Sequence, residues 1–267
     1  MRIARYVADG GDPAFGIVEL AEDGAGHPDS IAAITGDPLA GPVNYTGQRL
    51  LLDDVRLVSP VIPRSKVIGI GRNYAAHAAE LNNPVPDAPL LFIKPNTAVI
   101  GPGEPIVYPP ETENLHFEGE LAVVIGRICR RVPRDRAAEV IFGYTVGNDI
   151  TARDLQTSDK QWARAKGFDS FCPLGPWIVT HLSLDEASDL QVTTTVNGEL
   201  KQDGRTSDMV QGIAELIEYV SGFTTLLPGD VILTGTPAGV GPLQPGDQVA
   251  VTVEGIGTLT NPVVAEN

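Results

Sequence analysis

Two glutamates and one aspartate have the residue type and spacing for metal chemistry. Glu118 and Glu120 stand two residues apart just before the apolar run 121–125, so on a strand their side chains face the same side. Asp149 ends a second apolar run and supplies a third carboxylate. Carboxylate oxygens are the ligands that Mg²⁺ and Mn²⁺ prefer, and three protein ligands leave positions for water and substrate. The alternative interpretation is a polar strand end and a turn acid in water.

His77 and Glu80 form a second pair, in a helix that the sequence predicts over 74–81. Residues three apart share one helix face, so the Glu80 carboxylate can orient the His77 imidazole and raise its basicity. Such a pair suits a general base that acts on water. The alternative is an ion pair on the helix surface. The glycine-rich stretch before this helix is not a dinucleotide fingerprint, because Tyr74 occupies the third glycine position.

Three polar side chains further along the chain suit an anionic substrate. Arg153 and Gln156 can hold a carboxylate and a carbonyl oxygen. Lys166 can stabilise the negative charge of a developing enolate. These cations can equally be solvated or pair with neighbouring aspartates. The turn at Gly235 and Thr236 can bind an anion through backbone N–H and hydroxyl groups, although many turns look alike.

Short strands and a few helices must position these residues. The sequence contains 29 Gly and 22 Pro among 267 residues, which is typical of many tight turns. Strands are predicted at 2–7, 15–20, 55–58, 67–71, 90–94, 121–125, 141–146 and 231–233, and helices at 74–81, 134–140 and 207–220. Strands outnumber helices and do not alternate with them, so we expect an α+β fold with a mixed, rolled-up β core. Prolines near residue 60 separate a small β-rich N-terminal domain, 1–60, from a larger domain, 61–267.

Composition excludes several classes of function. The formal net charge is −15, which argues against nucleic-acid binding and against docking on an anionic membrane. No apolar run approaches the ~18 residues that span a bilayer, and the N-terminal residues predict a strand instead of a signal peptide. The two cysteines, Cys129 and Cys172, make no disulfide scaffold and suit the reducing cytoplasm, so we expect a cytoplasmic protein with two structural cysteines. The chain lacks a G-x-S-x-G elbow, which argues against a serine hydrolase.

These residues lie within segments that resemble the fumarylacetoacetate hydrolase family. Six segments keep the family's order and together make chance similarity very improbable, and the first sixty residues resemble the N-terminal extension of bacterial members. The segments are GRNYAAHAAEL (71–81), LLFIKPNTAVIGPG (90–103), LHFEGELAVVIGR (115–127), FGYTVGNDITARDLQ (142–156), KQWARAKGFDSFCPLGPW (160–177) and PGDVILTGTPAGVG (228–241).

The resemblance implies a role for each candidate residue. It implies a mixed β-roll core, a bound Mg²⁺ or Mn²⁺ and a homodimer. The implied metal ligands are Glu118, Glu120 and Asp149; the catalytic residues are His77, Glu80 and Lys166; the substrate contacts are Arg153, Gln156, Gly235 and Thr236. The metal hypothesis fails if the three carboxylates lie too far apart to share a single ion, or if lysine and arginine neutralise them instead.

The resemblance further implies an enzyme that acts on a small 2-oxo or enol (di)carboxylic acid through a metal-stabilised enolate. The favoured reaction is that of a 2-hydroxyhepta-2,4-diene-1,7-dioate isomerase, the label of the bacterial members that this chain most resembles. C–C hydrolysis of an acylpyruvate or fumarylpyruvate, and decarboxylation of oxaloacetate, use the same enolate and stay open. A non-catalytic, metal-dependent small-molecule binding protein is the alternative from another class, and it would need no His77–Glu80 base.

Overall fold

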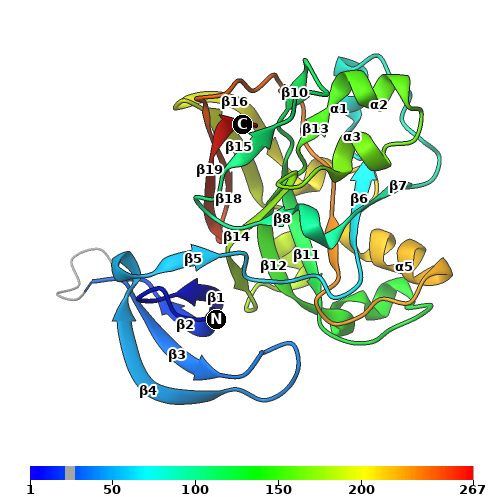
Figure 1. The fold of residues 1–267 in the computed structure, drawn as a ribbon. Helices are drawn as coiled ribbons and strands as arrows, with labels where there is room; N and C mark the ends of the chain where they lie inside the picture. Colours follow the sequence, from blue (N-terminus) through cyan, green and yellow to red (C-terminus); the bar gives the residue numbers. More distant parts are fainter. Residues whose placement is uncertain (22–27, 267) are drawn as a thin grey trace.

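A continuous sheet of twelve strands runs through the whole molecule (Figure 1). The computed structural model describes residues 1–21 and 28–266. Across the sheet the strands run β4 (Asn44–Leu51), β3 (Ser30–Thr35), β2 (Ala14–Glu19), β1 (Arg2–Val7), β14 (Cys172–Val179), β12 (Ile141–Asn148), β11 (Gly119–Ile125), β17 (Val231–Leu233), β6 (Val67–Gly71) and β7 (Leu90–Lys94), with β5 (Arg56–Val58) on β1 and β8 (Val99–Ile100) on β14.

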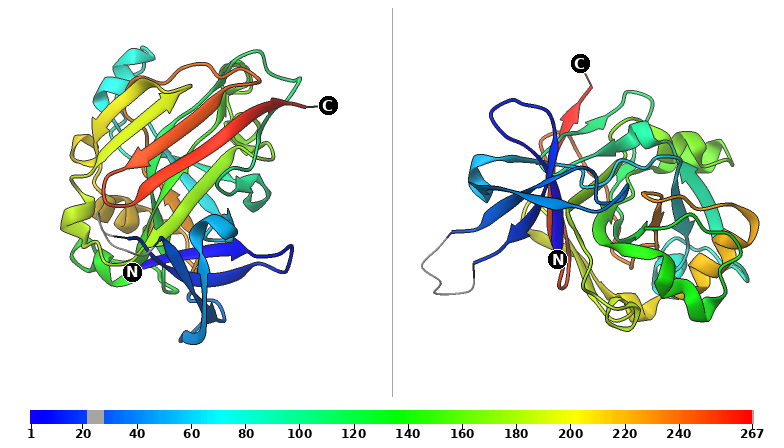
Figure 2. Two further views of the ribbon diagram at one scale, coloured as in Figure 1. Left: turned by 90° about the vertical axis from the view of Figure 1, so that its left-hand side faces the viewer. Right: turned by 90° about the horizontal axis from the view of Figure 1, so that it is seen from below.

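A second sheet packs against the middle of the first and closes the core. Its order is β16 (Glu199–Arg205), β15 (Gln191–Val196), β18 (Gln248–Val253), β19 (Gly257–Ala265) and β9 (Ile106–Tyr108). Leu121 and Val123 of β11 share one apolar cluster with Val192 of β15 and Val251 of β18. A short pair, β10 (Leu115–His116) with β13 (Thr151–Ala152), completes the strands. Figure 2 shows the yellow-to-red strands of this sheet crossing the green ones, an arrangement that confirms the α+β fold with a mixed β-roll core.

The helices are short and lie at the ends of the sheets. The α-helices are α1 (Ala75–Glu80), α2 (Arg153–Ser158), α3 (Ala163–Gly167), α4 (Leu184–Ala187) and α5 (Ile213–Phe223); the 3₁₀ helices are η1 (Leu52–Asp54), η2 (Asn96–Ala98), η3 (Arg134–Val140) and η4 (Thr206–Asp208). α1, α2 and α3 gather at the upper right of Figure 1, and α5 lies below them, packed against η3. Among the described residues, no helix combines the length and apolarity needed to cross a membrane.

The predicted helix over 207–220 is wrong in its first part. The helix α5 begins only at Ile213, with Gly212 as its N-cap residue. The residues before it run extended instead: the Val210 N–H donates to the Asn73 carbonyl at 2.7 Å, and Met209 forms a β-bridge with Tyr74. The apolar residues at 209–210 have helical spacing, but their pairing with residues 73–74 holds them outside the helix.

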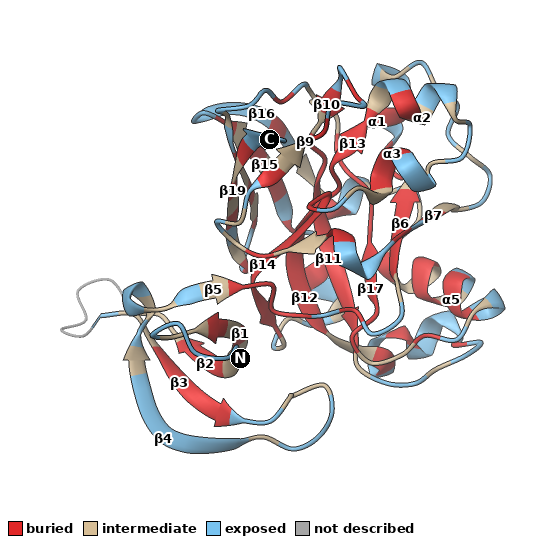
Figure 3. Cartoon of the chain, in the orientation of Figure 1, coloured by how far each residue is buried: buried red, intermediate tan, exposed pale blue. Residues whose placement is uncertain are grey.

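The N-terminal strands join the central sheet directly. β1 pairs with β14 at Arg2↔Val179 and Ile3↔Ile178, so one sheet runs through both predicted domains. The central strands β11, β12, β14 and β17 are buried, whereas the edge strand β4 is mostly exposed (Figure 3). The β-rich character of the N-terminal unit is confirmed, and the division near residue 60 stays a prediction.

Candidate active site

Three buried carboxylates converge where the β11–β12 hairpin opens. β11 and β12 pair antiparallel with Gly119 opposite Asn148, so Glu118, just before β11, and Asp149, just after β12, become neighbours. The Asp149 N–H donates to the Glu118 carbonyl at 2.8 Å. One oxygen from each of Glu118, Glu120 and Asp149 lies within 4.8 Å of the others. The convergence that the metal hypothesis requires is therefore present.

Lysine and arginine side chains neutralise two of these three carboxylates. Lys166 Nζ donates to Glu118 Oε2 at 2.8 Å and to Asp149 Oδ2 at 2.5 Å. Lys94, fully buried, bonds the other Asp149 oxygen. Arg153 Nη2 lies 2.6 Å from Glu118 Oε1, a charge contact without hydrogen-bond alignment. The condition set against the metal hypothesis is therefore met at Glu118 and Asp149, and any divalent ion held there competes with Lys166 for the same oxygens.

Glu120 is the carboxylate that best fits a bound cation. Its Oε2 accepts a hydrogen bond from the Gly235 N–H at 2.7 Å, and no ion pair with the described residues compensates its charge. Burial and the neighbouring Asp149 and Glu118 carboxylates raise the pKa of Glu120 well above its usual value. Burial alone would raise the pKa of Glu118 too, but Lys166 and Arg153 hold it well below the ordinary range. A hard-oxygen donor set with one uncompensated acid fits a divalent metal.

The His77–Glu80 pair forms as the helical spacing predicts. His77 Nδ1 lies 3.3 Å from Glu80 Oε2, and the imidazole is buried. The Gly239 N–H donates to Glu80 Oε1 at 3.0 Å, so the same carboxylate ties α1 to the loop after β17. With Nδ1 beside Glu80, the opposite ring nitrogen is the one left to exchange a proton in the cavity that His77 lines.

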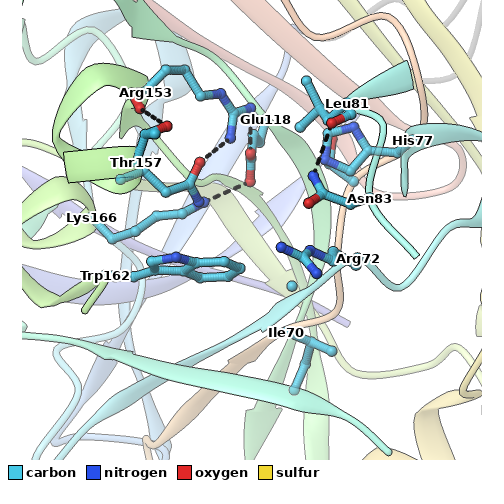
Figure 4. A pocket seen from close by; sticks show the side chains of 13 residues that line it. Ile70, Arg72, His77, Leu81, Asn83, Glu118, Arg153, Thr157, Trp162 and Lys166 are labelled. Carbon is cyan, nitrogen blue, oxygen red and sulfur yellow. Dashed lines mark hydrogen bonds and ion pairs between the residues drawn. The ribbon is translucent and has the colours of Figure 1, made fainter. Parts of the chain in front are cut away.

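A cavity of about 260 Å³ brings most of the candidate residues together (Figure 4). Six of the ten line it, namely His77, Glu118, Arg153, Gln156, Lys166 and Thr236. Arg153 Nη1 donates to Gln156 Oε1 at 3.0 Å, while the buried Arg153 Nε has no hydrogen-bond partner among the described residues. Such an unsatisfied donor is available to an anionic ligand.

The turn after β17 is already engaged in structural hydrogen bonds. The Gly235 N–H binds Glu120, and Gly235 is not among the residues that line the cavity. Thr236 does line it, but its hydroxyl donates to the Gly119 carbonyl at 2.8 Å and accepts from Gln202 at 2.7 Å. Gly235 has φ +100° and a Cβ there would lie 2.7 Å from the Asn73 side chain, so only glycine fits this close approach.

Comparison with known proteins decides the family. The family model described as fumarylacetoacetate hydrolase, C-terminal, matches residues 66–264, and a model described as Rv2993c-like, N-terminal, matches residues 1–60. The chain belongs to the fumarylacetoacetate hydrolase family. Members of the family are enzymes, isomerases and hydrolases among them, and the family is generally metal-dependent.

Individual members of the family align along nearly the whole chain. Protein Rv2993c of Mycobacterium tuberculosis is 52% identical over 99% of this chain and 98% of its own length. A 5-carboxymethyl-2-hydroxymuconate delta-isomerase from Mycobacterium smegmatis has 53% identity, full coverage of both chains and a TM-score of 0.89. A 2-hydroxyhepta-2,4-diene-1,7-dioate isomerase from Mycobacterium marinum has 48% identity over 100% and 99% of the chains, also at 0.89. A more distant relative, the Bos taurus oxaloacetate tautomerase FAHD2B, mitochondrial, is 44% identical over 79% of this chain and 70% of its own length.

Three residues at the candidate active site were not predicted from the sequence. Lys94 bonds Asp149, while Arg72 and Trp162 line the cavity. For Lys94 a signal exists: in strand β7 it shares a face with Phe92, and both are buried. A lysine on the buried face of a strand points to a charged partner inside the protein.

Proposed function

We propose that this chain is a divalent-metal-dependent enzyme that acts on a 2-oxo or enol carboxylic acid, with the reaction of a 2-hydroxyhepta-2,4-diene-1,7-dioate isomerase. One observation carries the proposal: Glu118 of the carboxylate cluster, His77 of the His77–Glu80 pair, and the cations Arg153 and Lys166 line a single cavity. The names of the two mycobacterial isomerases support the choice of reaction.

Glu118, Glu120 and Asp149 are the residues that would hold the metal. When bound, a divalent ion supplies Lewis-acid stabilisation of negative charge on substrate oxygens. Arg153 offers its unpartnered Nε to the substrate carboxylate, and Gln156, which accepts from Arg153 Nη1, keeps that guanidinium oriented. Lys166 adds positive charge beside the enolate oxygen.

His77 is the residue that moves the proton. Held by Glu80, it takes the proton from the enol hydroxyl, and the electron pair of the enolate shifts to carbon. A proton then returns to the carbon at the far end of the diene, which leaves the 2-oxo acid as product. The number of protons is unchanged, so no co-reactant is needed.

Tautomerisation of oxaloacetate is a second candidate function, because the bovine relative carries that name. It needs the same transfer of an enol proton to carbon, over a shorter distance. Hydrolysis of an acylpyruvate or fumarylpyruvate and decarboxylation of oxaloacetate remain alternatives, because both proceed through the same enolate.

The test is a substrate panel assayed with Mg²⁺ or Mn²⁺ and after EDTA treatment. The panel holds dienols of the seven-carbon dicarboxylic type, enol-oxaloacetate, fumarylpyruvate and acylpyruvates. We expect metal-dependent isomerisation to be fastest, and His77→Ala to lower it about 100-fold or more without loss of metal binding. The matched control is His181→Ala, which changes an exposed histidine outside the cavity. Absence of turnover with every substrate and metal would leave a binding protein as the better account.

A further inference from the structure

One guanidinium in the cavity wall, that of Arg72, has no anionic partner among the residues that the structure describes. Arg72, Arg153 and Lys166 all line the cavity, but Arg153 and Lys166 each lie against Glu118. Within residues 1–21 and 28–266, the side chain of Arg72 forms neither a hydrogen bond nor an ion pair, and its guanidinium lies 6.0 Å from the ring centroid of Trp162. Figure 4 shows Arg72 and Arg153 reaching the cavity from different sides.

The structure holds Arg72 in this place firmly. Its φ is +57°, a left-handed conformation that glycine adopts more readily than arginine. The next residue is fixed on both sides, because Asn73 Nδ2 donates to the Thr234 carbonyl at 2.8 Å and Asn73 Oδ1 accepts from the Gln211 N–H at 2.9 Å. Trp162 in turn packs edge-on against Phe92. The backbone at Arg72 is thus fixed, and its guanidinium lies over the Trp162 ring with N–H donors that no described residue accepts.

We infer that Arg72 binds a second, distal carboxylate of the substrate, so that the enzyme selects 2-oxo or enol dicarboxylic acids over monocarboxylic analogues of equal length. This inference rests on the proposed function, in which Arg153 and the carboxylate cluster hold the reacting end. The planar guanidinium matches a carboxylate through two parallel N–H bonds. The carbon chain between the two ends lies beside Ile70 and Trp162, the apolar surfaces of the cavity near Arg72. Specificity then comes from charge at the far end of the substrate, away from the reacting atoms.

The experiment compares two acids that differ only at the far end. These are 2,4-dioxoheptanedioate and 2,4-dioxoheptanoate, in which a methyl group replaces the distal carboxylate. Binding of these two acids is measured calorimetrically with Mg²⁺ present, and turnover of the seven-carbon dienol dicarboxylate is measured separately. We expect wild-type protein to bind the dicarboxylate ten- to hundredfold more tightly, and Arg72→Met to abolish that preference. Arg72→Lys should restore only part of it, because a lysine cannot form the paired bonds.

The matched control is Arg131→Met. Arg131 is also an arginine of positive φ, +54°, but it is exposed and outside the cavity. Equal thermal unfolding of the two methionine variants shows that any effect of Arg72→Met is local. The inference is overturned if wild-type protein binds both acids equally or binds neither, or if Arg72→Met weakens both to the same extent. Lack of turnover with a retained, Arg72-dependent preference in binding would instead count against the proposed function alone.

Discussion

Lys166 occupies the oxygens that a metal needs. Its ammonium group contacts both Glu118 and Asp149, at 2.8 and 2.5 Å. It also lies 4.8 Å from the centroid of the Phe92 ring, which helps to hold it there. Metal binding at these carboxylates therefore requires Lys166 to give up part of its contacts, and the released charge is then available to the substrate.

Lys166→Met should bind Mn²⁺ at least about tenfold more tightly than wild-type protein while losing turnover. Removing a positive charge within ~4 Å of two ligands removes repulsion of ~1–4 kcal/mol from the bound cation. Titration calorimetry checks the affinity, and the rise of the unfolding temperature on adding Mn²⁺ checks it independently. Lys201→Met, which changes a partly exposed lysine paired with Glu199, serves as control. Weaker Mn²⁺ binding in Lys166→Met would contradict this picture.

At the residue level, the sequence predicts the acids better than their partners. Spacing along two strands is enough to bring Glu118, Glu120 and Asp149 together, because the hairpin register does the rest. Two missed cations come from elsewhere: Lys94, which pairs with Asp149, lies in β7, and Arg72, which lines the cavity, directly follows β6. Their approach depends on how distant strands pair, which no local pattern encodes.

α1 carries the proposed base, and its Glu80 side chain ties it to the loop after β17. Glu80 faces His77 with Oε2 and accepts a hydrogen bond from the Gly239 N–H with Oε1. Its charge therefore acts on His77, and its acceptor oxygen holds the helix to Gly239. A glutamine keeps an acceptor oxygen for Gly239 but loses the negative charge. An alanine loses both.

Two variants of Glu80 therefore separate the effect of its charge on His77 from its hydrogen bond with Gly239. Glu80→Gln should lower turnover about tenfold, because His77 loses a charged partner, and leave hydrogen exchange at the Gly239 amide unchanged. Glu80→Ala should lower turnover at least as much and also speed exchange at that amide. Exchange measured by NMR and steady-state kinetics check the pair. If Glu80→Gln frees the Gly239 amide as much as Glu80→Ala does, then charge, and not an acceptor oxygen alone, secures α1.

Sequence periodicity locates several elements around the site but predicts no helix at α2 or α3, and at two further elements the structure shows why the prediction fails. Helix α5 starts at Ile213, six residues after the expected start, because residues 209–210 pair with the chain at 73–74. Strand β14 was not predicted, since Pro173 and Pro176 lack the N–H that a central strand normally donates. Every residue of β14 is nevertheless buried. Tertiary pairing and burial on both faces overrode the local propensity in each case.

On the scale of the whole molecule, the N-terminal strands and the catalytic core share one sheet and one apolar interior. Ile3 packs with Ile17 and Ile34, and this cluster contacts the partly buried Phe142 of β12 in the core. Tyr6 and Val18 belong to the same cluster as Val179 and Trp177. The predicted boundary near residue 60 therefore does not interrupt the packing.

Ile3→Ala should destabilise the entire chain in one cooperative transition. Removing a buried isoleucine side chain costs about 2–5 kcal/mol, and calorimetry should show one peak at lower temperature. The control is Ile62→Ala, because Ile62 is 55% exposed and should change stability little. Two separate peaks, with only the smaller one shifted, would mean that residues 1–60 unfold on their own.

The acidic cluster and the rim of the cavity are built by different parts of the chain. The acids sit on the β11–β12 hairpin in the buried sheet, whereas Arg72, His77 and Trp162 come from short helices and connecting segments. Loops tolerate replacement far better than buried strands do. Exchanges of rim side chains can therefore alter which ligand the cavity accepts while the buried carboxylate cluster stays unchanged. Such an architecture allows related enzymes to keep one buried site and to differ in the substrates that they accept.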